Sequence, residues 1–453
     1  MGAKTIKKRK PLNISQIVAI VFASLILCGT ALLMLPFASR DGQSAGFLKA
    51  LFTATSSTCV TGLILADTWV QWSGFGQVVI ISLIEIGGLG FMSVASSVLF
   101  LLRKKISMNE RAVIAVSVGS DDMNDVVRLQ KKTIICSLGA EFVGAIILSL
   151  RFLSKYGIAK ALKLGFFHSI SAFCNAGFDI FGFETPGGSI SLYGTDTVVV
   201  LTLCFLILFG GLGFVVWDEI IRPRSKRKKL SVYTKLVLIT SAALVFFGML
   251  LVCLTEWNNP ATLGAMSVPD KLKAALFQSV TSRTAGFAGI DQGGLSEGGK
   301  AVTMFLMIIG GNSGSTAGGL KCVTFVVLLL FLWAKLRGKE NIHVFNRSIP
   351  EKHVMNALIV FGVMVFLSFI GGTIISATSS VSFTDALYEA ISAIATVGLT
   401  TGITPALSVV SKLLLVVFMY FGRVGILTLS LGFMQGKQKG DKFKYADTDL
   451  LIG

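Results

Sequence analysis

The sequence predicts an all-α polytopic membrane protein, with four pseudo-symmetric repeats around one central pore. Three observations lead to this fold class. Apolar residues make up 53% of the 453 residues and charged residues only 14%, which is far more apolar than a soluble domain requires. Apolar runs long enough to cross a bilayer recur along the chain. A short glycine-containing stretch also recurs four times at a nearly constant interval.

Four glycines mark this stretch and lie 109 to 115 residues apart: Gly62, Gly177, Gly286 and Gly398. Such a period predicts four copies of one structural unit. Each copy contains an apolar span (M1), a half-length segment that ends in Ser or Thr (P), the glycine stretch, and a second span (M2). The expected copies cover residues 12–105, 128–222, 232–338 and 353–436, and residues 437–453 are expected to form a polar cytoplasmic tail.

The elements of each copy follow from the apolar runs. The M1 spans are predicted at 17–37, 133–152, 233–254 and 354–377, and the half-length segments at 46–56, 161–171, 270–281 and 383–392. The M2 spans are predicted at 75–102, 197–221, 301–336 and 407–433, with a break in the third. We therefore expect eight transmembrane helices and four pore half-helices.

The net charge of +17 follows the expected topology rather than indicating a nucleic-acid partner. The basic residues collect in short segments between apolar runs, at 103–111, 128–132, 222–229, 335–339, 347–352 and 437–444. If all of these segments are cytoplasmic, the positive-inside rule is satisfied by one multi-pass topology with both termini inside. The partner implied by the composition is the lipid bilayer of the cell membrane.

The half-length segments indicate a pore. About twelve helical residues cover only about 18 Å, roughly half of a bilayer, so the chain must enter and turn back. Irregular backbone at that depth is tolerated only where it lines a wet cavity or is buried in protein. Rings of backbone carbonyls replace the hydration shell of a monovalent cation, and glycine supplies the positive φ that turns successive carbonyls inward.

Four residues from each copy are therefore predicted to form a selectivity filter of backbone carbonyls: Cys59, Val60, Thr61, Gly62, Cys174, Asn175, Ala176, Gly177, Arg283, Thr284, Ala285, Gly286, Ala395, Thr396, Val397 and Gly398. The alternative is that the glycines only permit close helix packing. The register of the third copy is open, because it reaches Gly286 one residue sooner than the others reach their glycines. We expect Arg283 to brace loop carbonyls from behind rather than to face the ions.

A barrier is predicted below the filter. The third M2 contains a stretch too rich in glycine and hydroxyls to hold a helix in lipid. The fourth M2 places an arginine where the other copies have glycine, and a charge at that depth is costly unless it faces a cavity or a partner. The expected gate consists of Gly310, Gly311, Asn312, Ser313, Gly314, Ser315, Thr316, Ala317, Gly318, Gly319 and Arg423. The alternatives are a passive kink in the loop and a structural pair between Arg423 and a glutamate such as Glu85.

Patterns of catalytic and cofactor-binding residues are absent from the sequence. The three histidines are scattered, and the glycine-rich stretch of the third M2 lacks the Lys-Ser/Thr ending of a phosphate-binding loop. Seven cysteines without CxxC spacing predict neither a disulfide framework nor a structural zinc site. We therefore expect a protein that is not an enzyme and carries no cofactor of its own.

Four filters in register, "TCVTGL", "CNAGFD", "RTAGF" and "ATVGLT", with a glycine-rich break in the third M2 and an arginine in the fourth, resemble the Trk, Ktr and HKT superfamily of potassium transporters. The resemblance covers nearly the whole chain and is closest to the Ktr membrane subunits (KtrB/KtrD type). It implies K⁺ uptake through a homodimer with one pore per protomer.

The same resemblance implies a partner and leaves an alternative open. It implies assembly with a cytosolic ring of RCK-type nucleotide-binding subunits (KtrA/KtrC type), which would carry the nucleotide, and it makes Na⁺ a candidate activator. A sodium-coupled or sodium-permeable secondary carrier remains the alternative. That class would favour inverted halves over four parallel copies.

Overall fold

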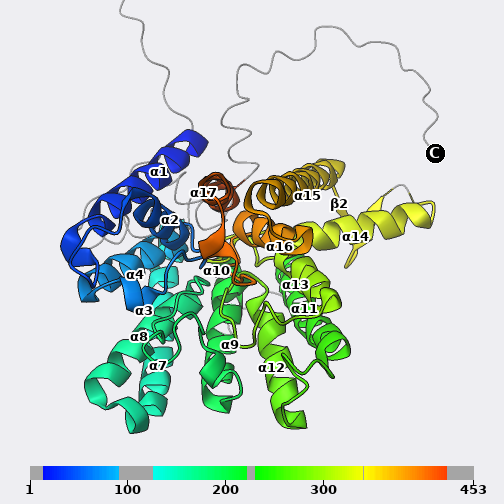
Figure 1. The fold of residues 1–453 in the computed structure, drawn as a ribbon. Coiled ribbons are helices and arrows are strands. Elements are labelled where there is room, and N and C mark those ends of the chain that lie inside the picture. The colour runs from blue at the N-terminus through cyan, green and yellow to red at the C-terminus, as the bar shows by residue number, and fades with distance from the viewer. Residues whose placement is uncertain (1–13, 91–125, 222–229, 340, 426–453) are drawn as a thin grey trace, which may run out of the picture.

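The computed structural model describes residues 14–90, 126–221, 230–339 and 341–425. Helices dominate these residues (Figure 1). The exception is a small antiparallel hairpin of β1 (Ile342–Val344) and β2 (Arg347–Ile349), which pairs His343 with Ser348. The predicted basic segments 103–111 and 222–229 and the tail 437–453 lie outside the described residues.

The helices follow one another in four similar sets. The first set contains α1 (Ile14–Leu33), α2 (Phe47–Thr58), the short α3 (Thr68–Gln71) and α4 (Gly74–Leu89), and the second contains α7 (Val126–Tyr156), α8 (Ile158–Phe173), α9 (Thr197–Leu212) and α10 (Phe214–Ile221). The third set contains α11 (Val232–Glu256), α12 (Val268–Thr281), α13 (Glu297–Ile308) and α14 (Cys322–Leu336). The fourth contains α15 (Glu351–Ser379), α16 (Phe383–Ile394) and α17 (Val409–Val424). The described residues also contain three 3₁₀ turns: η1 (Pro36–Ala38), η2 (Ser191–Tyr193) and η4 (Thr404–Ala406).

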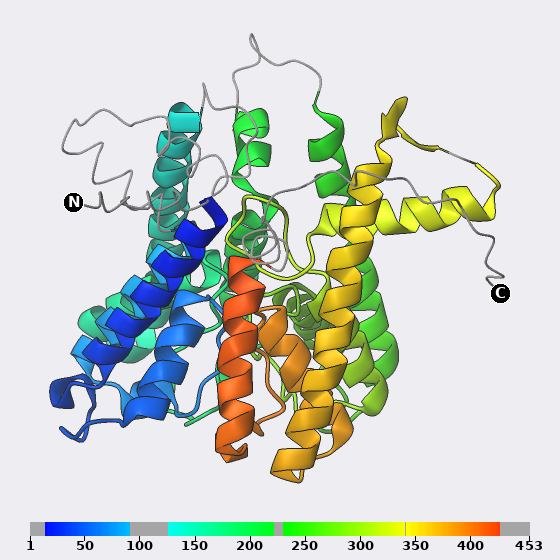
Figure 2. The ribbon, with the colours of Figure 1, turned by 90° about the horizontal axis from the view of Figure 1, so that it is seen from above.

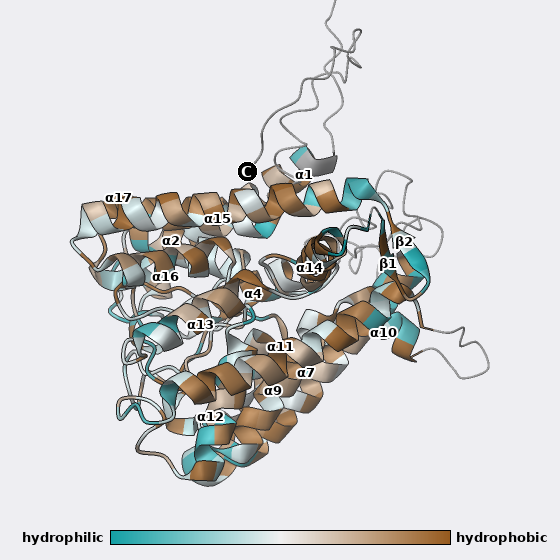
Figure 3. Cartoon of the chain, turned by 90° about the vertical axis from the view of Figure 1, so that its right-hand side faces the viewer, coloured by the Kyte–Doolittle hydropathy of each residue, from teal (hydrophilic) through white to brown (hydrophobic). Residues whose placement is uncertain are grey.

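The first helix of each set is long and apolar enough to cross a membrane, within α1, α7, α11 and α15. These helices expose large apolar side chains, as expected for a surface in contact with lipid, and Figure 3 shows brown residues along α11 and α15. Each of the four has at least one apolar side chain that is more than 60% exposed, for example Leu27 61%, Leu150 65%, Phe246 62% and Phe366 64%.

The helix that leads back across each set, which we call the return helix (α4, α9, α13 or α17), starts at a side-chain cap. The side chains of Ser73, Asp196, Ser296 and Ser408 accept hydrogen bonds from backbone N–H groups in the first turns of α4, α9, α13 and α17. Such caps satisfy donors that a helix start leaves unpaired. The sequence therefore fixes where each return helix begins.

The prediction of one continuous span over 197–221 is wrong. The chain turns by 100° between α9 and α10, at Gly213, whose φ is +95°. Glycine adopts such a φ at the least cost, so the fourth residue of the GGLG stretch ends the helix. Gly90 after α4 and Gly425 after α17 have similar φ values of +82° and +94°. The continuations predicted at 91–102 and 426–433 lie outside the described residues.

The four sets form a closed ring. The return helix of one set packs against the half-length helix of the next: α4 against α8, α9 against α12, α13 against α16, and α17 back against α2. In Figure 1 the sets follow one another around the centre, and the orange fourth set lies beside the blue first set. Figure 2 shows α14 lying across the direction of α15 and α17. This closure brings the four glycine stretches to the centre of the described structure.

Candidate functional site

The glycine stretches share one backbone conformation. Each follows a half-length helix, namely α2, α8, α12 or α16. The residue two positions before each glycine is left-handed: Val60 φ +57°, Asn175 φ +59°, Thr284 φ +66° and Thr396 φ +51°. The glycines themselves have φ of +101° (Gly62), +68° (Gly177), +81° (Gly286) and +93° (Gly398). A repeated strained residue of this kind is found mostly at functional sites.

This shared conformation fixes the register that the sequence left open. Counted from the left-handed residue, Arg283 takes the place of Cys59 and Cys174. The expected positive φ at each glycine is present, but the left-handed residue two positions earlier carried no sequence signal. Valine at such a φ is unusual, because its branched side chain is crowded there.

The four glycines converge on one another. A Cβ built on each glycine would lie very close to a carbonyl oxygen of the next set: 2.5 Å from Ala176 for Gly62, 2.7 Å from Ala285 for Gly177, 2.5 Å from Val397 for Gly286, and 2.0 Å from Thr61 for Gly398. The last of these contacts leads back to the first set, so the four loops form a closed ring. We call the four segments 59–62, 174–177, 283–286 and 395–398 the glycine ring. The close approach is between loops, which differs from packing glycines on helix faces.

Hydroxyl groups at the ends of the half-length helices support the ring. Ser56 Oγ accepts from the N–H of Gly62 at 3.0 Å, and Ser392 Oγ accepts from the N–H of Gly398 at 3.1 Å. In the other two sets the hydroxyl donates to the carbonyl after the glycine: Ser171 to Phe178 at 2.7 Å and Thr281 to Phe287 at 2.8 Å. The apolar residue after each glycine is buried to at least 99%: Leu63, Phe178, Phe287 and Leu399. The loops are thus held by hydrogen bonds and by apolar anchors.

Each of three half-length helices carries a buried polar side chain that bonds to the chain beyond the ring. These side chains, which sequence reasoning missed, are Glu389, Gln278 and His168. Glu389 accepts from Thr400, and from Thr404 at 3.0 Å. Gln278 and Gln292 form a reciprocal pair of amide hydrogen bonds at 2.8 and 3.0 Å.

In the second set, His168 Nε2 accepts from the N–H of Ile180 at 3.4 Å. His168, Gln278 and Glu389 precede their glycines by nearly equal distances in the chain. That shared spacing is the signal through which they could have been found.

Cavities adjoin both sides of the glycine ring. One, of about 270 Å³, is lined by the four glycines and by residues that follow them, including Asp179 and Asp291. The other, of about 480 Å³, is lined by Gly87, Gly88, most of the loop after α13, and Arg423. The C-terminal ends of the four half-length helices point to the ring between them. This end of a helix carries partial negative charge, which stabilises a cation.

The segment between α13 and α14 is an ordered loop that rests on the broken second return helix. Asn312 N–H donates to the carbonyl of Gly211 at 3.0 Å, and Phe214 N–H donates to the carbonyl of Gly314 at 2.8 Å. Thr316 Oγ1 donates to the carbonyl of Phe173 at 3.0 Å, next to the second loop of the ring. These hydrogen bonds join the loop to the second set.

Arg423 joins this loop to the first set. Its guanidinium donates to the carbonyl of Thr316 at 2.5 Å, to that of Gly88 at 3.1 Å, and to that of Gly87. Within the described ranges Arg423 forms no ion pair with Glu85. Seven of the eleven predicted gate residues line the second cavity: Ser313, Gly314, Ser315, Ala317, Gly318, Gly319 and Arg423.

Arg283 lies behind the ring. It is only 6% exposed, and its Nη2 lies 3.0 Å from Cys322 Sγ and 3.5 Å from the carbonyl of Gly310. Nη1 donates to the carbonyl of Ser241 on α11 at 3.4 Å. Its carbonyl partners thus belong to α11 and to the start of the loop 310–319.

Comparisons with known proteins agree with this architecture. The model of the TrkH family, described as cation transport proteins, matches residues 4–444. The chain is 38% identical over 450 residues to the potassium/sodium uptake protein NtpJ of Enterococcus hirae, covering 98% of both chains. It is 40% identical over 438 residues to the Ktr system potassium uptake protein B of Bacillus subtilis, covering 97% of this chain and 96% of that protein.

A solved structure shares the fold. The crystal structure of the potassium transporter TrkH from Vibrio parahaemolyticus superposes with a TM-score of 0.71 over 94% of this chain and 86% of that one, at 19% identity. The family model and the two relatives each match nearly the whole chain. The chain is a member of the TrkH family of cation transport proteins.

Proposed function

We propose that this chain is the membrane-embedded, ion-translocating subunit of a potassium uptake system. The observation that carries the proposal is the closed ring of four glycine loops, with cavities on both sides and four helix C-termini pointing to it. Carbonyl oxygens of the ring would replace the hydration shell of K⁺. Full-length relatives named as potassium uptake proteins support K⁺ as the transported ion.

In this proposal the four sets act as M1-P-M2 repeats with the bounds 12–105, 128–222, 232–338 and 353–436. The glycine ring acts as the selectivity filter. Fixed carbonyls stabilise the ion without a side-chain charge, so K⁺ is held strongly enough to enter and weakly enough to leave. The acceptor-lined outer cavity with Asp179 and Asp291 would concentrate cations in front of the filter.

The loop 310–319 and Arg423 would act as the gate. The guanidinium places a positive charge in the cavity below the ring, where it repels a cation, and its hydrogen bond to Thr316 holds the loop across the path. Moving the loop requires this bond and the contact between Thr316 and Phe173 to break together. A protein partner that pulls on α13 or α14 could supply that work.

The regulatory partner in this proposal is a cytosolic ring of RCK-type nucleotide-binding subunits. The name of the Bacillus subtilis relative refers to a Ktr system, which supports a partner. The chain would work as a homodimer in the cell membrane, with both termini cytoplasmic and the nucleotide bound by the partner alone. We propose no enzymatic activity.

A sodium-coupled or sodium-permeable carrier is the second candidate. The specific observation in its favour is that the Enterococcus hirae relative is named a potassium/sodium uptake protein. The two candidates differ in selectivity and coupling. A K⁺-selective path discriminates against Na⁺ and carries flux without a sodium gradient, whereas a coupled carrier requires that gradient.

The direct test is growth of a potassium-uptake-deficient strain on low potassium, with the chain expressed together with its ring partner. Rescue supports the proposal, and failure of a correctly inserted protein to rescue would refute it. Gly62→Ser sharpens the test. A Cβ at this position would lie 2.5 Å from the carbonyl of Ala176, so the variant should weaken discrimination of K⁺ over Na⁺. Unchanged inhibition by Na⁺ would count against the filter.

A further inference from the structure

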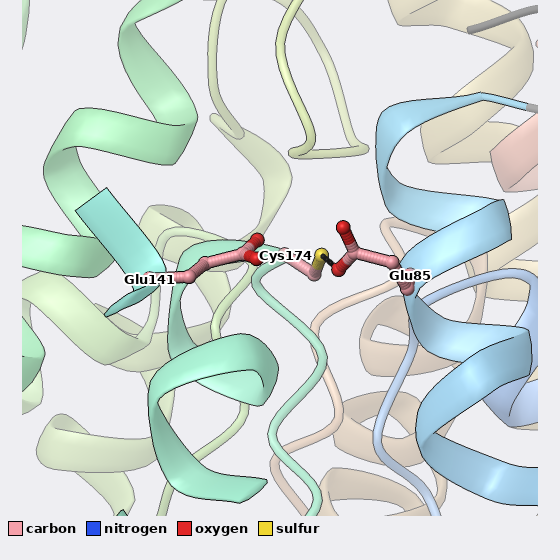
Figure 4. Close-up of side chains that lie close together, drawn as sticks. All are labelled: Glu85, Glu141 and Cys174. Atoms are coloured by element: carbon pink, nitrogen blue, oxygen red, sulfur yellow. Dashed lines mark hydrogen bonds between the residues drawn. The ribbon is translucent and has the colours of Figure 1, made fainter. Parts of the chain in front are cut away.

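Two glutamates and a cysteine lie together between the first and second helix sets, away from the axis of the ring. Glu85 comes from α4, Glu141 from α7, and Cys174 from the end of α8 (Figure 4). One ligand atom from each residue lies within 4.8 Å of the other two. The three residues come from separate segments, so CxxC-type spacing could not reveal this cluster.

The cluster has buried ligand atoms without partners. Glu141 is only 4% exposed, it points toward Glu85 in Figure 4, and its Oε1 has no hydrogen-bond partner within the described part of the chain. Oε1 of Glu85 is likewise unpartnered among those residues. Cys174 Sγ donates to Glu85 Oε2 at 3.4 Å. Burying two facing carboxylates is costly unless a positive charge lies between them.

Basic side chains do not supply that charge within the described ranges. Ion pairs found there involve neither Glu85 nor Glu141. Arg423, the guanidinium below the ring, is occupied by the carbonyls of Thr316, Gly87 and Gly88. The site therefore offers negative charge and free lone pairs to a cation from solution.

We propose that Glu85, Glu141 and Cys174 bind one divalent transition-metal cation of the zinc class. Two carboxylate oxygens and one sulfur are the ligand types that Zn²⁺ and Cd²⁺ accept, and three protein ligands leave a fourth position for water. Mg²⁺ and Ca²⁺ require six or more oxygens, and K⁺ gains little from sulfur. The bound cation replaces the thiol proton that now lies between Sγ and Oε2.

The position of Cys174 connects the site to the ring. Cys174 is followed by Asn175, one of the left-handed residues of the ring. Its Sγ also packs against Gly88, since a Cβ built on Gly88 would lie 2.6 Å from this sulfur. The carbonyl of Gly88 in turn accepts a hydrogen bond from Arg423. A cation here would cross-link α4 and α7 to the second loop. The binding itself does not depend on the proposed transport function.

The test measures cadmium binding to the full-length protein in lipid nanodiscs after removal of any affinity tag. Wild type should bind Cd²⁺ at this site with a thiolate-to-cadmium charge-transfer absorption in the ultraviolet. Glu141→Gln and Cys174→Ser should each lose one equivalent of bound Cd²⁺ per chain, and Cys174→Ser should also lose the absorption. Cys59→Ser is the matched control, because Cys59 has the same place in the first loop and is fully buried, and it should retain the wild-type stoichiometry.

Two results would overturn the proposal. Wild-type protein that binds no Cd²⁺ would mean that the carboxylates hold a proton instead. Equal binding by wild type and Glu141→Gln would place the metal elsewhere. If Cys174→Ser does not fold, as judged by gel filtration, Glu85→Gln joins Glu141→Gln in deciding the outcome. Since the readout is binding, failure of potassium transport would not affect it.

Discussion

Alanine substitutions at Gly398 and Gly402, compared with each other, separate the effect of backbone strain from the effect of displacing a carbonyl oxygen of the glycine ring. Gly398 has φ +93°, and a Cβ there would lie 2.0 Å from the carbonyl oxygen of Thr61, so the two atoms must separate by about 1.4 Å to reach an ordinary contact at 3.4 Å. Gly402 has φ +92° with nothing within 4 Å of a built Cβ. Alanine costs about 1–2 kcal/mol of strain at either position. Only Gly398→Ala must also move an oxygen of the ring.

We therefore expect both variants to unfold at a lower temperature but only one to lose selectivity. Each 1.4 kcal/mol of lost preference lowers the K⁺ to Na⁺ ratio about tenfold, and Gly398→Ala should lose at least that much. The assay is ⁸⁶Rb⁺ uptake into proteoliposomes in competition with Na⁺ or K⁺, with thermal unfolding measured on the same preparations. Wild-type discrimination in a folded Gly398→Ala protein, or equal loss in Gly402→Ala, would refute the reasoning.

Three further predictions concern the gate and the support of the ring. Deleting 310–319 should raise cation flux in proteoliposomes without abolishing assembly, and unchanged flux would exclude a gate there. Arg423→Gln removes the cavity charge and the bonds to Thr316 and the first set, so basal flux should rise severalfold, whereas lower flux would favour a structural role. Glu389→Gln leaves Thr404 and Thr400 with a weaker hydrogen-bond acceptor. It should therefore lower the free energy of unfolding, measured by chemical denaturation, by about 1–3 kcal/mol. Glu297→Gln is the control at an exposed glutamate.

The order of the helix sets could be predicted from the sequence because it depends on local signals. Apolar length distinguishes long helices from half-length ones, and Ser or Asp caps mark the starts of the return helices. The glycine period predicted which loops would meet. The break after Leu212 was missed because an apolar run continues through it, and one glycine with positive φ was enough to turn the chain.

Contacts between sets could not be read from the sequence. The closure of α17 on α2 joins segments hundreds of residues apart, and the cluster of Glu85, Glu141 and Cys174 joins residues from three separate segments. The partners of Arg283 illustrate the same limit. Its residue type predicted a bracing role, but only the fold shows that the carbonyls it reaches are those of Ser241 and Gly310.

The most direct test of the central claim is a cryo-electron microscopy map of the full-length protein in the presence of Rb⁺ or Tl⁺, compared with a map without either ion. Strong density on the axis between Gly62, Gly177, Gly286 and Gly398, within coordination distance of their carbonyls, is the predicted result. A ring without ion density, or density bound only by side chains elsewhere, would contradict a filter built from backbone oxygens.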